Sequence, residues 1–321
     1  MTTRQMSSSH GTASYSTSLC IRILLNTLIV QQALKLCDDE TVGSENNNSD
    51  EEDLKLILKK CRSIVGFFKR SEVGNRMLAE KQKQLGSSTI LKLKQDISTR
   101  WNSTFFMLER LIKLKEPITI VMINLKEAPN NLESDEWSII EDVIPLLKPF
   151  NNLTVELSAE QYPTISKVIP LIRGLQCSLG LKCPKTRQGN YIKERLLENT
   201  SKRFDGIENQ TITPHFSRAT LLDPRCKKVA FGLTQNANDA EINLVSEIST
   251  LMRNVSNTEQ AAVEINTSED DDSVWYFLQS RVSTVQSQTT TTSSAIALMK
   301  QYLGMPYQGL NCNMATYWNE H

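Results

Sequence analysis

The residues best equipped for chemistry lie together between Asp96 and Asn102, in the run DISTRWN. Arginine and tryptophan are costly to leave in a turn unless something holds them, and here Arg100 stands directly before Trp101. On spacing alone, such a pair is most often a cation–π or packing contact. This polar corner is therefore the first candidate site, and a purely structural contact is the competing interpretation.

Basic side chains surround the corner. From Leu54 to Lys115 the chain has 15 Lys and Arg against 4 Asp and Glu, although the whole chain balances 36 against 36. Such a block could lie along a phosphate backbone, and it could equally be the solvated face of helices. Within the block, the candidate DNA contacts are Lys59, Lys60, Lys92 and Lys94.

The sequence offers no pattern for nucleophilic or zinc chemistry. His10, His215 and His321 have no H-x-x-H or H-E-x-x-H spacing, and the seven cysteines include no C-x-x-C pair. Asp223 precedes Pro224, and Asp-Pro commonly begins a turn or helix, so capping is a better interpretation than catalysis. We expect no catalytic residue, no metal ligand and no bound cofactor in this chain.

The cysteines also bear on compartment. They are scattered and odd in number, with no secretory signal pattern ahead of them, which is typical of reduced thiols in an intracellular protein. The longest apolar run, Ile23 to Val30, is too short to span a membrane. We therefore expect an intracellular protein without a membrane partner.

The elements that position the corner are predicted to be mainly helical. Leu91 and Leu93 alternate with Lys92 and Lys94, which indicates a short half-buried strand near residues 89–97. An apolar helical face begins at Phe105, with Ser98 and Thr99 as possible N-caps. No alternation of strands and helices follows, so the fold class is mainly α.

Capping residues, glycines and prolines along the chain predict where other helices begin and end. A helix with Ser49 or Asp50 as its N-cap is expected at the end of an acidic linker, and a second from Ser71 to about Leu85, ended by Gly86. Ser134 begins another helix, which Pro145 and Pro149 should kink or end. A helix after Asp239 should turn Ile242, Val245, Ile248 and Leu251 inward, whereas Gln286 to Ser294 should be a polar interruption.

Three stretches resemble a known family. Asp96 to Leu111, D-x-x-T-R-W-N-S-T-x-x-M-L-E-R-L, closely resembles the signature of hAT-type transposases and their BED zinc-finger relatives. Trp137 to Leu175 resembles the helical insertion of those proteins. Ala219 to Lys228 resembles their L-L-D-P-R-F-K pattern, with Cys226 in place of the aromatic. Near the N-terminus, Ile23 replaces the histidine of the family's C-x-x-H.

The resemblance implies a layout of the chain. It predicts a disordered N-terminus at 1–18, a remnant core helix at 19–37 and an acidic linker at 38–53. Residues 54–115 would be a partial RNase H-like α/β remnant with basic helices, a short strand and the Arg-Trp corner. Residues 116–285 would be a helical insertion domain, and 286–321 the start of the dimerisation region, where Tyr302, Leu303 and Trp318 match the family.

The resemblance also implies what chemistry to expect. Active members use three carboxylates to hold divalent metal ions, and a separate BED finger holds zinc. Neither the three carboxylates nor the finger is found at the matching places, so we expect a truncated and catalytically inactive member that is no longer an enzyme. In active relatives the Arg-Trp pair lies near the catalytic site, which makes Arg100 and Trp101 candidate DNA contacts.

These expectations lead to one preferred function and two alternatives. The preferred function is a nuclear, transposase-derived protein that binds DNA non-specifically and dimerises with itself or with another BED or hAT-family protein. One alternative is a helical protein–protein interaction module without DNA binding, in which Trp101 is a core residue. The other is a fragment of an active DNA transposase.

Overall fold

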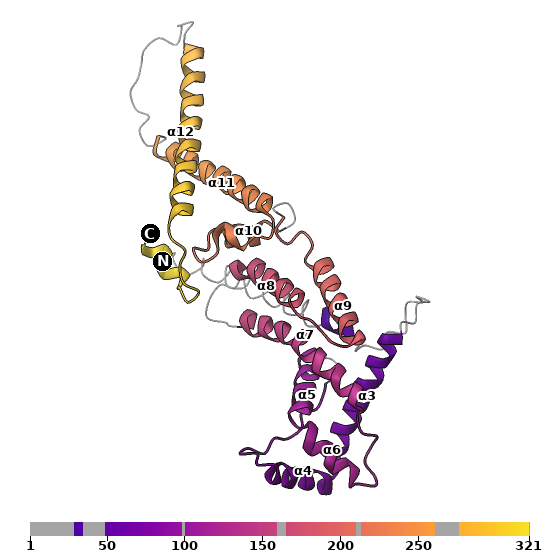
Figure 1. Cartoon of the computed structure of the whole chain (residues 1–321). Helices are drawn as coiled ribbons and strands as arrows, with labels where there is room; N and C mark the ends of the chain where they lie inside the picture. Colours follow the sequence, from indigo (N-terminus) through magenta and orange to yellow (C-terminus); the bar gives the residue numbers. More distant parts are fainter. Residues whose placement is uncertain are drawn as a thin grey trace. The chain divides into compact units, whose positions relative to one another are not determined.

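A computed structural model describes residues 29–34, 49–97, 100–158, 165–209, 213–260 and 276–320 (Figure 1). The chain divides into two compact units, one comprising Met1–Thr164 with Gly174–Asp205 and the other Ile165–Arg173 with Gly206–His321. All regular elements within the described ranges are helical. The predicted mainly α fold is therefore confirmed, whereas the expected α/β remnant is not found in these residues.

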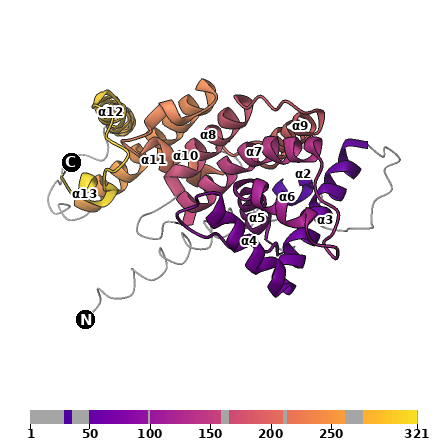
Figure 2. The same ribbon diagram turned by 60° about the horizontal axis from the view of Figure 1, so that its bottom comes forward.

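Unit 1 is an assembly of helices in which segments far apart in sequence pack together (Figure 2). Helix α5 packs on α7, α4 packs on α6, and α9 packs on α2, α3 and α7. The helices of this unit are α2 (Val30–Leu34), α3 (Ser49–Arg70), α4 (Glu72–Gln84), α5 (Trp101–Lys113), α6 (Lys115–Ile123), α7 (Ser134–Ser158) and α9 (Arg187–Arg203). The residues of α8 (Val168–Gly180) are divided between the two units.

Helix α3 has the apolar face that its sequence predicts. Its buried apolar side chains are Leu54, Ile57, Leu58, Cys61, Ile64, Val65 and Phe68. The helix begins at Ser49, so the last five residues of the predicted linker are helical, with acidic side chains in the favourable first turn. Asp50 is buried there and pairs with Arg187 at 2.9 Å.

The turn between α3 and α4 also follows the prediction. Ser71 is the N-cap of α4, and its hydroxyl accepts a hydrogen bond from the N–H of Gly74 at 3.0 Å. Gly86 follows the helix with a φ of 79°, a backbone conformation that glycine adopts without steric cost. Capping chemistry therefore fixes both ends of this helix.

The predicted strand at residues 89–97 is wrong. Residues 90–97 contain no strand, and no backbone ladder forms along them in the part of the chain that the structure describes. Instead, the side-chain amide of Gln82 bonds both the N–H and the C=O of Leu91, at 2.8 and 3.1 Å. A side chain thus satisfies the groups that a neighbouring strand would have paired.

Two helix boundaries differ from those expected. Helix α5 begins at Trp101 with Arg100 as its N-cap, so Trp101 and Asn102 lie in the first turn of the helix and not in the loop before it; the predicted N-caps Ser98 and Thr99 fall outside the described residues. Helix α7 continues through Pro145 and Pro149 to Ser158. The loss of N–H donors at the prolines is offset by the burial of the same helix's apolar face, including Leu146, Leu147 and Phe150.

Unit 2 contains η2 (Ile165–Lys167), α10 (Pro214–Leu221), η3 (Lys227–Ala230), α11 (Thr234–Gln260), α12 (Tyr276–Gly304) and α13 (Met314–Glu320). Helices α11 and α12 pack against each other, and α10 packs on α11 (Figure 1). Their shared core contains Leu221, Ala240, Leu244, Met299, Tyr302 and Tyr317. This core joins the end of α10 to the C-terminal segment.

Two expectations for unit 2 need correction, and other predictions concern residues outside the described ranges. Ile242 and Leu251 are 64% and 65% exposed, because α11 turns Ala240 and Leu244 inward instead. Residues Gln286–Ser294 do not interrupt a helix but lie within α12. Residues 261–275 of this unit lie outside the described residues, as do residues 1–28 and 35–48, which include the predicted disordered N-terminus and most of the predicted core helix and acidic linker. No described helix combines the length and apolar character needed to cross a bilayer.

Candidate functional site

Asp96 is the centre of the polar corner. Its carboxylate accepts hydrogen bonds from the hydroxyls of Ser103 at 2.8 Å and Thr104 at 2.9 Å, and from the Nε of Arg62 at 2.7 Å. The Asp96 side chain is only 3% exposed. Three residues of the D-x-x-T-R-W-N-S-T signature therefore tie the extended segment to α3 and α5, a structural use of the motif.

Trp101 belongs to the core of unit 1. It is 1% exposed, and its ring packs edge-on against Phe150 at a centroid distance of 6.3 Å. An indole in this position cannot stack on a base unless it leaves the core. The position of Trp101 therefore argues against the expected DNA contact and favours the competing interpretation, in which Trp101 is a core residue.

The other three basic candidates near the corner are exposed. Lys92, Lys94 and Arg100 lie along the extended segment, and Lys69 at the end of α3 donates to the side chain of Gln95 at 2.9 Å. In the described ranges, no acidic side chain forms an ion pair with Lys92, Lys94 or Arg100. We call these residues, Lys69, Lys92, Lys94 and Arg100, the basic surface.

A depression of about 770 Å³ lies beside the basic surface. Phe106 forms part of its wall, and the ammonium of Lys94 lies 4.5 Å from the centre of that ring. Asp96 also lines the depression, but its charge is engaged by Arg62. The unpaired charge around this depression is therefore positive, which suits an anionic partner.

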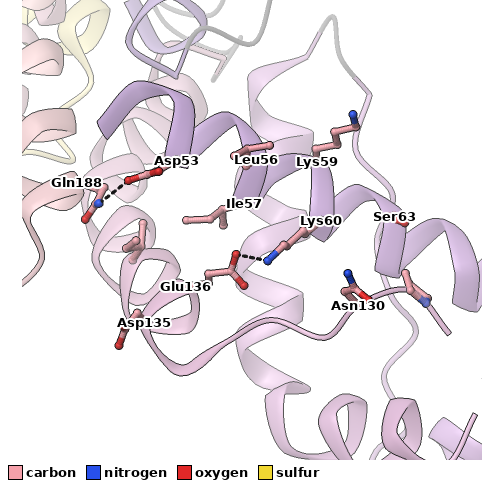
Figure 3. A pocket seen from close by; sticks show the side chains of 12 residues that line it. Asp53, Leu56, Ile57, Lys59, Lys60, Ser63, Asn130, Asp135, Glu136 and Gln188 are labelled. Carbon is pink, nitrogen blue, oxygen red and sulfur yellow. Dashed lines mark hydrogen bonds and ion pairs between the residues drawn. The ribbon is translucent and has the colours of Figure 1, made fainter. Parts of the chain in front are cut away.

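Lys59 and Lys60 line a different cavity of unit 1, about 620 Å³ in volume (Figure 3). Lys60 pairs with Glu136 at 2.6 Å across the cavity, and Gln188 donates to Asp53 at 3.0 Å. The hydrogen bond with Glu136 raises the pKa of Lys60, although burial opposes the rise. Because charges of both signs line this cavity, it is a weaker candidate for binding phosphate than the basic surface.

In unit 2, the L-L-D-P-R-C-K run forms hydrogen bonds with the end of α12 and the residues that follow it. The hydroxyl of Tyr302 donates to the C=O of Leu221 at 3.1 Å, and the N–H of Gln308 donates to the C=O of Pro224 at 3.0 Å. Arg225 donates to the C=O of Leu310 at 3.4 Å. With Lys227, these contacts form what we call the clamp, made by residues 221–227 on residues 302–310.

Asp223 orients the clamp. It is fully buried and holds the guanidinium of Arg225 in a two-point ion pair, while also accepting from the N–H of Arg225 at 3.0 Å. Burial on its own would raise the pKa of Asp223, but hydrogen bonds from Arg225 and Ser166 outweigh it and hold the pKa below its usual value. The carboxylate thus stays ionised in a structural pair. Asp223 thus stands at the start of a turn at residues 224–226, the kind of structural role that an Asp-Pro pair predicts.

Lys227 is a buried member of the clamp with an unusual backbone conformation. Its side chain is 1% exposed and its φ is 46°, the left-handed region that non-glycine residues seldom adopt. The ammonium donates to the C=O groups of Tyr302 at 2.8 Å and Met305 at 2.5 Å, and it lies 4.9 Å from the centre of the Tyr302 ring. Burial lowers the pKa of this lysine. The cation sits where the helix dipole of α12 is negative.

The three predicted dimerisation residues lie close together within one chain. Tyr302 is buried in the core of unit 2, and Leu303 is partly buried against it. Trp318 is 43% exposed, with its ring centre 5.2 Å from that of Tyr302. Of the three, Trp318 has the side chain most available to a partner.

Neither a metal-ligand cluster nor an activated thiol is found at the buried acidic and cysteine residues that the structure describes. No group of three or more His, Cys, Asp or Glu side chains in the described ranges is placed to hold a metal ion. Burial raises the pKa of the Cys61 thiol to about 12 and that of Cys226 to about 11. Both thiols are therefore protonated and weakly nucleophilic at neutral pH.

Two residues that organise these sites escaped sequence reasoning. Gln82 has no pattern that sets it apart from other helix residues, and Glu208 stands in a loop. Glu208 is 1% exposed and accepts hydrogen bonds from Arg173, from Asn236 at 3.0 Å and from the N–H of Gly232 at 2.8 Å. Lys227 could have been noticed, because it completes the L-D-P-R-C-K run.

Comparison with known proteins gives these sites a family context. Residues 48–146 match the profile of the ZBED1 RNase-like helical domain, a range that covers α3 to the first half of α7. The chain is 28% identical over 267 residues to human "Zinc finger BED domain-containing protein 4", an alignment that covers 82% of this chain and 22% of that protein. It therefore spans about a fifth of that relative.

Two further relatives cover shorter parts of the chain. The "Putative transcriptional regulator tpeD" of Talaromyces stipitatus is 27% identical over 156 residues, which cover 47% of this chain and 18% of that protein. The "Putative AC transposase" of Zea mays is 25% identical over 181 residues, which cover 54% of this chain and 21% of that protein. From these matches, the chain is similar to BED- and hAT-type proteins, and its residues 48–146 resemble the ZBED1 RNase-like helical domain.

Proposed function

We propose that this chain is a transposase-derived nuclear protein that acts by binding, with unit 1 contacting DNA and unit 2 joining two copies. The observation that carries the DNA part is the basic surface, where Lys92, Lys94 and Arg100 are exposed and free of acidic partners in the described ranges. The similarity to a BED zinc-finger protein, a putative transcriptional regulator and a putative transposase supports a nuclear role.

The basic surface suits phosphate better than base recognition. Lys92, Lys94 and Arg100 are exposed within nine residues of one another, between α4 and the start of α5, so their charges are available to a phosphate backbone. Neither the lysines nor Arg100 is fixed by an ion pair that would aim it at a base edge. Contacts of this kind give salt-dependent affinity without sequence preference.

Fluorescence anisotropy with a labelled DNA duplex tests this part. We expect the triple variant Lys92→Glu, Lys94→Glu, Arg100→Glu to bind at least tenfold more weakly than the native chain at low salt. The slope of log affinity against log salt should also fall in magnitude by about 0.9 for each phosphate that the variant no longer neutralises.

A matched control reverses three exposed lysines elsewhere in unit 1, Lys126, Lys148 and Lys185. It changes the net charge by the same amount, so it removes long-range attraction without touching the basic surface. Equal loss of affinity in both triple variants would contradict a localised DNA site.

The self-association part rests on exposed apolar side chains of unit 2. Those on α11 and α12 that are at least 40% exposed are Ile242, Leu251, Val255, Leu278, Val282, Val285, Ile296 and Leu298. Apolar surface of this extent is costly in water and is typical of protein contact sites. A second copy, or another BED or hAT-family protein, would cover it.

A helical protein–protein module without DNA binding is the second candidate, and the burial of Trp101 favours it. The two candidates separate cleanly in the anisotropy experiment. If the native chain self-associates but binds no duplex at low salt, the second candidate replaces the first.

Strand cleavage is no part of the proposal. A strand-transfer assay on this chain with Mg²⁺ or Mn²⁺ and a hairpin substrate tests that statement, and we expect no product above the protein-free background. Metal-dependent product would show that the chain is a working part of a transposase.

A further inference from the structure

The clamp holds the loop at residues 305–311 in a defined position beside an apolar pocket of unit 2. The loop is tied at Met305 by Lys227, at Gln308 by Pro224 and at Leu310 by Arg225. Its backbone is therefore ordered before any partner arrives. Such preorganisation reduces the entropy that binding would otherwise cost.

Leu310 is displayed at the tip of this ordered loop. It is 83% exposed, although its own C=O is held by Arg225. A leucine in this state leaves most of its apolar surface in water, so a contact that buries it is stabilised by the hydrophobic effect. Leu310 thus has the properties of an anchor residue, but its side chain is not inserted into a pocket of its own chain.

A suitable pocket lies in the same unit. Its volume is about 270 Å³, and its walls include Leu298, Tyr302, Met305 and Trp318. Methionine and aromatic side chains adapt to an inserted aliphatic group, and anchors of this kind dominate the energy of contacts. Leu310 does not fill the pocket of its own chain, because it is exposed.

The charge pattern indicates what the partner is. Residues 301–319 contain no Asp, Glu, Lys or Arg, and residues 282–299 contain none either. Lys300 is thus the one charged residue between 282 and 319, so this segment gives little attraction to nucleic acid and can face an identical segment with little like-charge repulsion. Because anchor and pocket lie on the same segment, a two-fold axis would let each copy insert its Leu310 into the other.

We propose that Leu310 of one copy inserts into the pocket lined by Leu298, Tyr302, Met305 and Trp318 of a second copy, and that this reciprocal contact anchors the dimer. The inference rests on the proposed self-association and names the residues responsible for it. The clamp acts by positioning: Lys227 and Arg225 hold the loop so that the anchor projects from its tip.

Analytical ultracentrifugation of the full chain over a range of concentrations tests the inference. We expect Leu310→Asp to raise the dimer dissociation constant at least tenfold, because a carboxylate cannot enter an apolar pocket. Leu181→Asp is the matched control, since Leu181 is 82% exposed in unit 1 and should leave the constant unchanged. Far-ultraviolet circular dichroism and thermal melting should show all variants folded, because both leucines are on the surface.

A second variant guards against an indirect effect. Leu298 is 49% exposed at the pocket, so the double variant Leu298→Lys, Leu310→Asp places opposite charges face to face across the proposed contact. We expect it to recover dimerisation to within a few-fold of the native constant. An unchanged dimer in Leu310→Asp would overturn the inference while leaving self-association standing; a native chain that stays monomeric at every concentration would overturn both.

Discussion

At the scale of single residues, Trp101 and Glu208 show how burial decides the role of a side chain. The indole of Trp101 is enclosed next to Phe150, and its loss would leave a large void in unit 1. The carboxylate of Glu208 is enclosed too, but with four polar groups aimed at it, from Arg173, Gly232, Leu233 and Asn236. One residue fills space and the other satisfies donors, so the two respond differently to substitution and to pH.

Trp101→Ala should lower the free energy of unfolding of unit 1 by about 3–5 kcal/mol, because it removes a fully buried aromatic side chain. Urea denaturation followed by circular dichroism measures the change, with Leu181→Ala as a surface control. If Trp101→Ala instead left stability within about 1 kcal/mol of the native value and selectively weakened DNA binding, Trp101 would be a base-stacking residue after all.

Glu208→Gln should lower the free energy of unfolding of unit 2 by about 1–3 kcal/mol at pH 7, because a charged acceptor is lost among fixed donors. Burial would raise the pKa of Glu208, yet the hydrogen bonds of Arg173, Asn236 and Gly232 keep it below 4.5. A lowered pKa stabilises the native state above about pH 4.5, and this contribution disappears as the pH falls through the lower native value.

The difference between native and Glu208→Gln chains should therefore be constant near neutral pH and shrink below about pH 4.5. Urea titrations at several pH values measure it, and Glu320→Gln, at an exposed position of the same unit, serves as the control. A difference that grows as the pH falls would contradict the assignment.

At the scale of elements, the sequence predicts helices well where apolar period and caps agree. Helix α3 buries the predicted face, and Ser71 and Gly86 mark the ends of α4. Prediction fails where a distant group decides the outcome. Leu91 and Leu93 have a strand pattern, but Gln82 takes the place of the neighbouring strand, and nothing local in the sequence shows that contact.

Gln82→Ala should release the extended segment from α4. Gln82 is 1% exposed and makes both hydrogen bonds to Leu91, so its truncation removes about 1–3 kcal/mol of local stability. Hydrogen exchange followed by mass spectrometry should show faster exchange at residues 88–97 with little change in α3. Gln84→Ala, at an exposed position of the same helix, should leave the segment protected.

Lys227→Met should loosen the end of α12. The substitution keeps the length of the side chain but removes the ammonium that bonds the C=O groups of Tyr302 and Met305. We expect faster hydrogen exchange over residues 302–312 and a higher dimer dissociation constant, with the middle of α12 unchanged. Lys300→Met, at an exposed position of the same helix, is the control, and identical behaviour of the two variants would remove Lys227 from the clamp.

At the scale of the whole molecule, we assign one binding task to each unit. The helical class and the family signature could be read from the sequence, because the motifs are local and dense. The sites were only partly predictable: Arg100, Lys92 and Lys94 lie on the surface as expected, whereas Trp101 is buried. Burial depends on which helices pack together, and periodicity within one helix cannot supply that information.

The interaction surfaces were harder to foresee than the elements. The exposed apolar side chains of α11 follow from which residues pack inward, and the sequence pattern favoured Ile242 and Leu251 for the core. Leu310 stands in a stretch with no helix or strand pattern, and only its fixed backbone makes it a candidate anchor. Such features emerge from tertiary contacts between the 221–227 run and the end of α12.

The most direct test of the central claim is sedimentation velocity of the full chain with a fluorescent DNA duplex, recorded at low and at high salt. We predict a complex that contains two chains at low salt. At high salt the duplex should be released while the chains stay paired, because only the DNA contact is electrostatic. A duplex that sediments alone at low salt would contradict the claim.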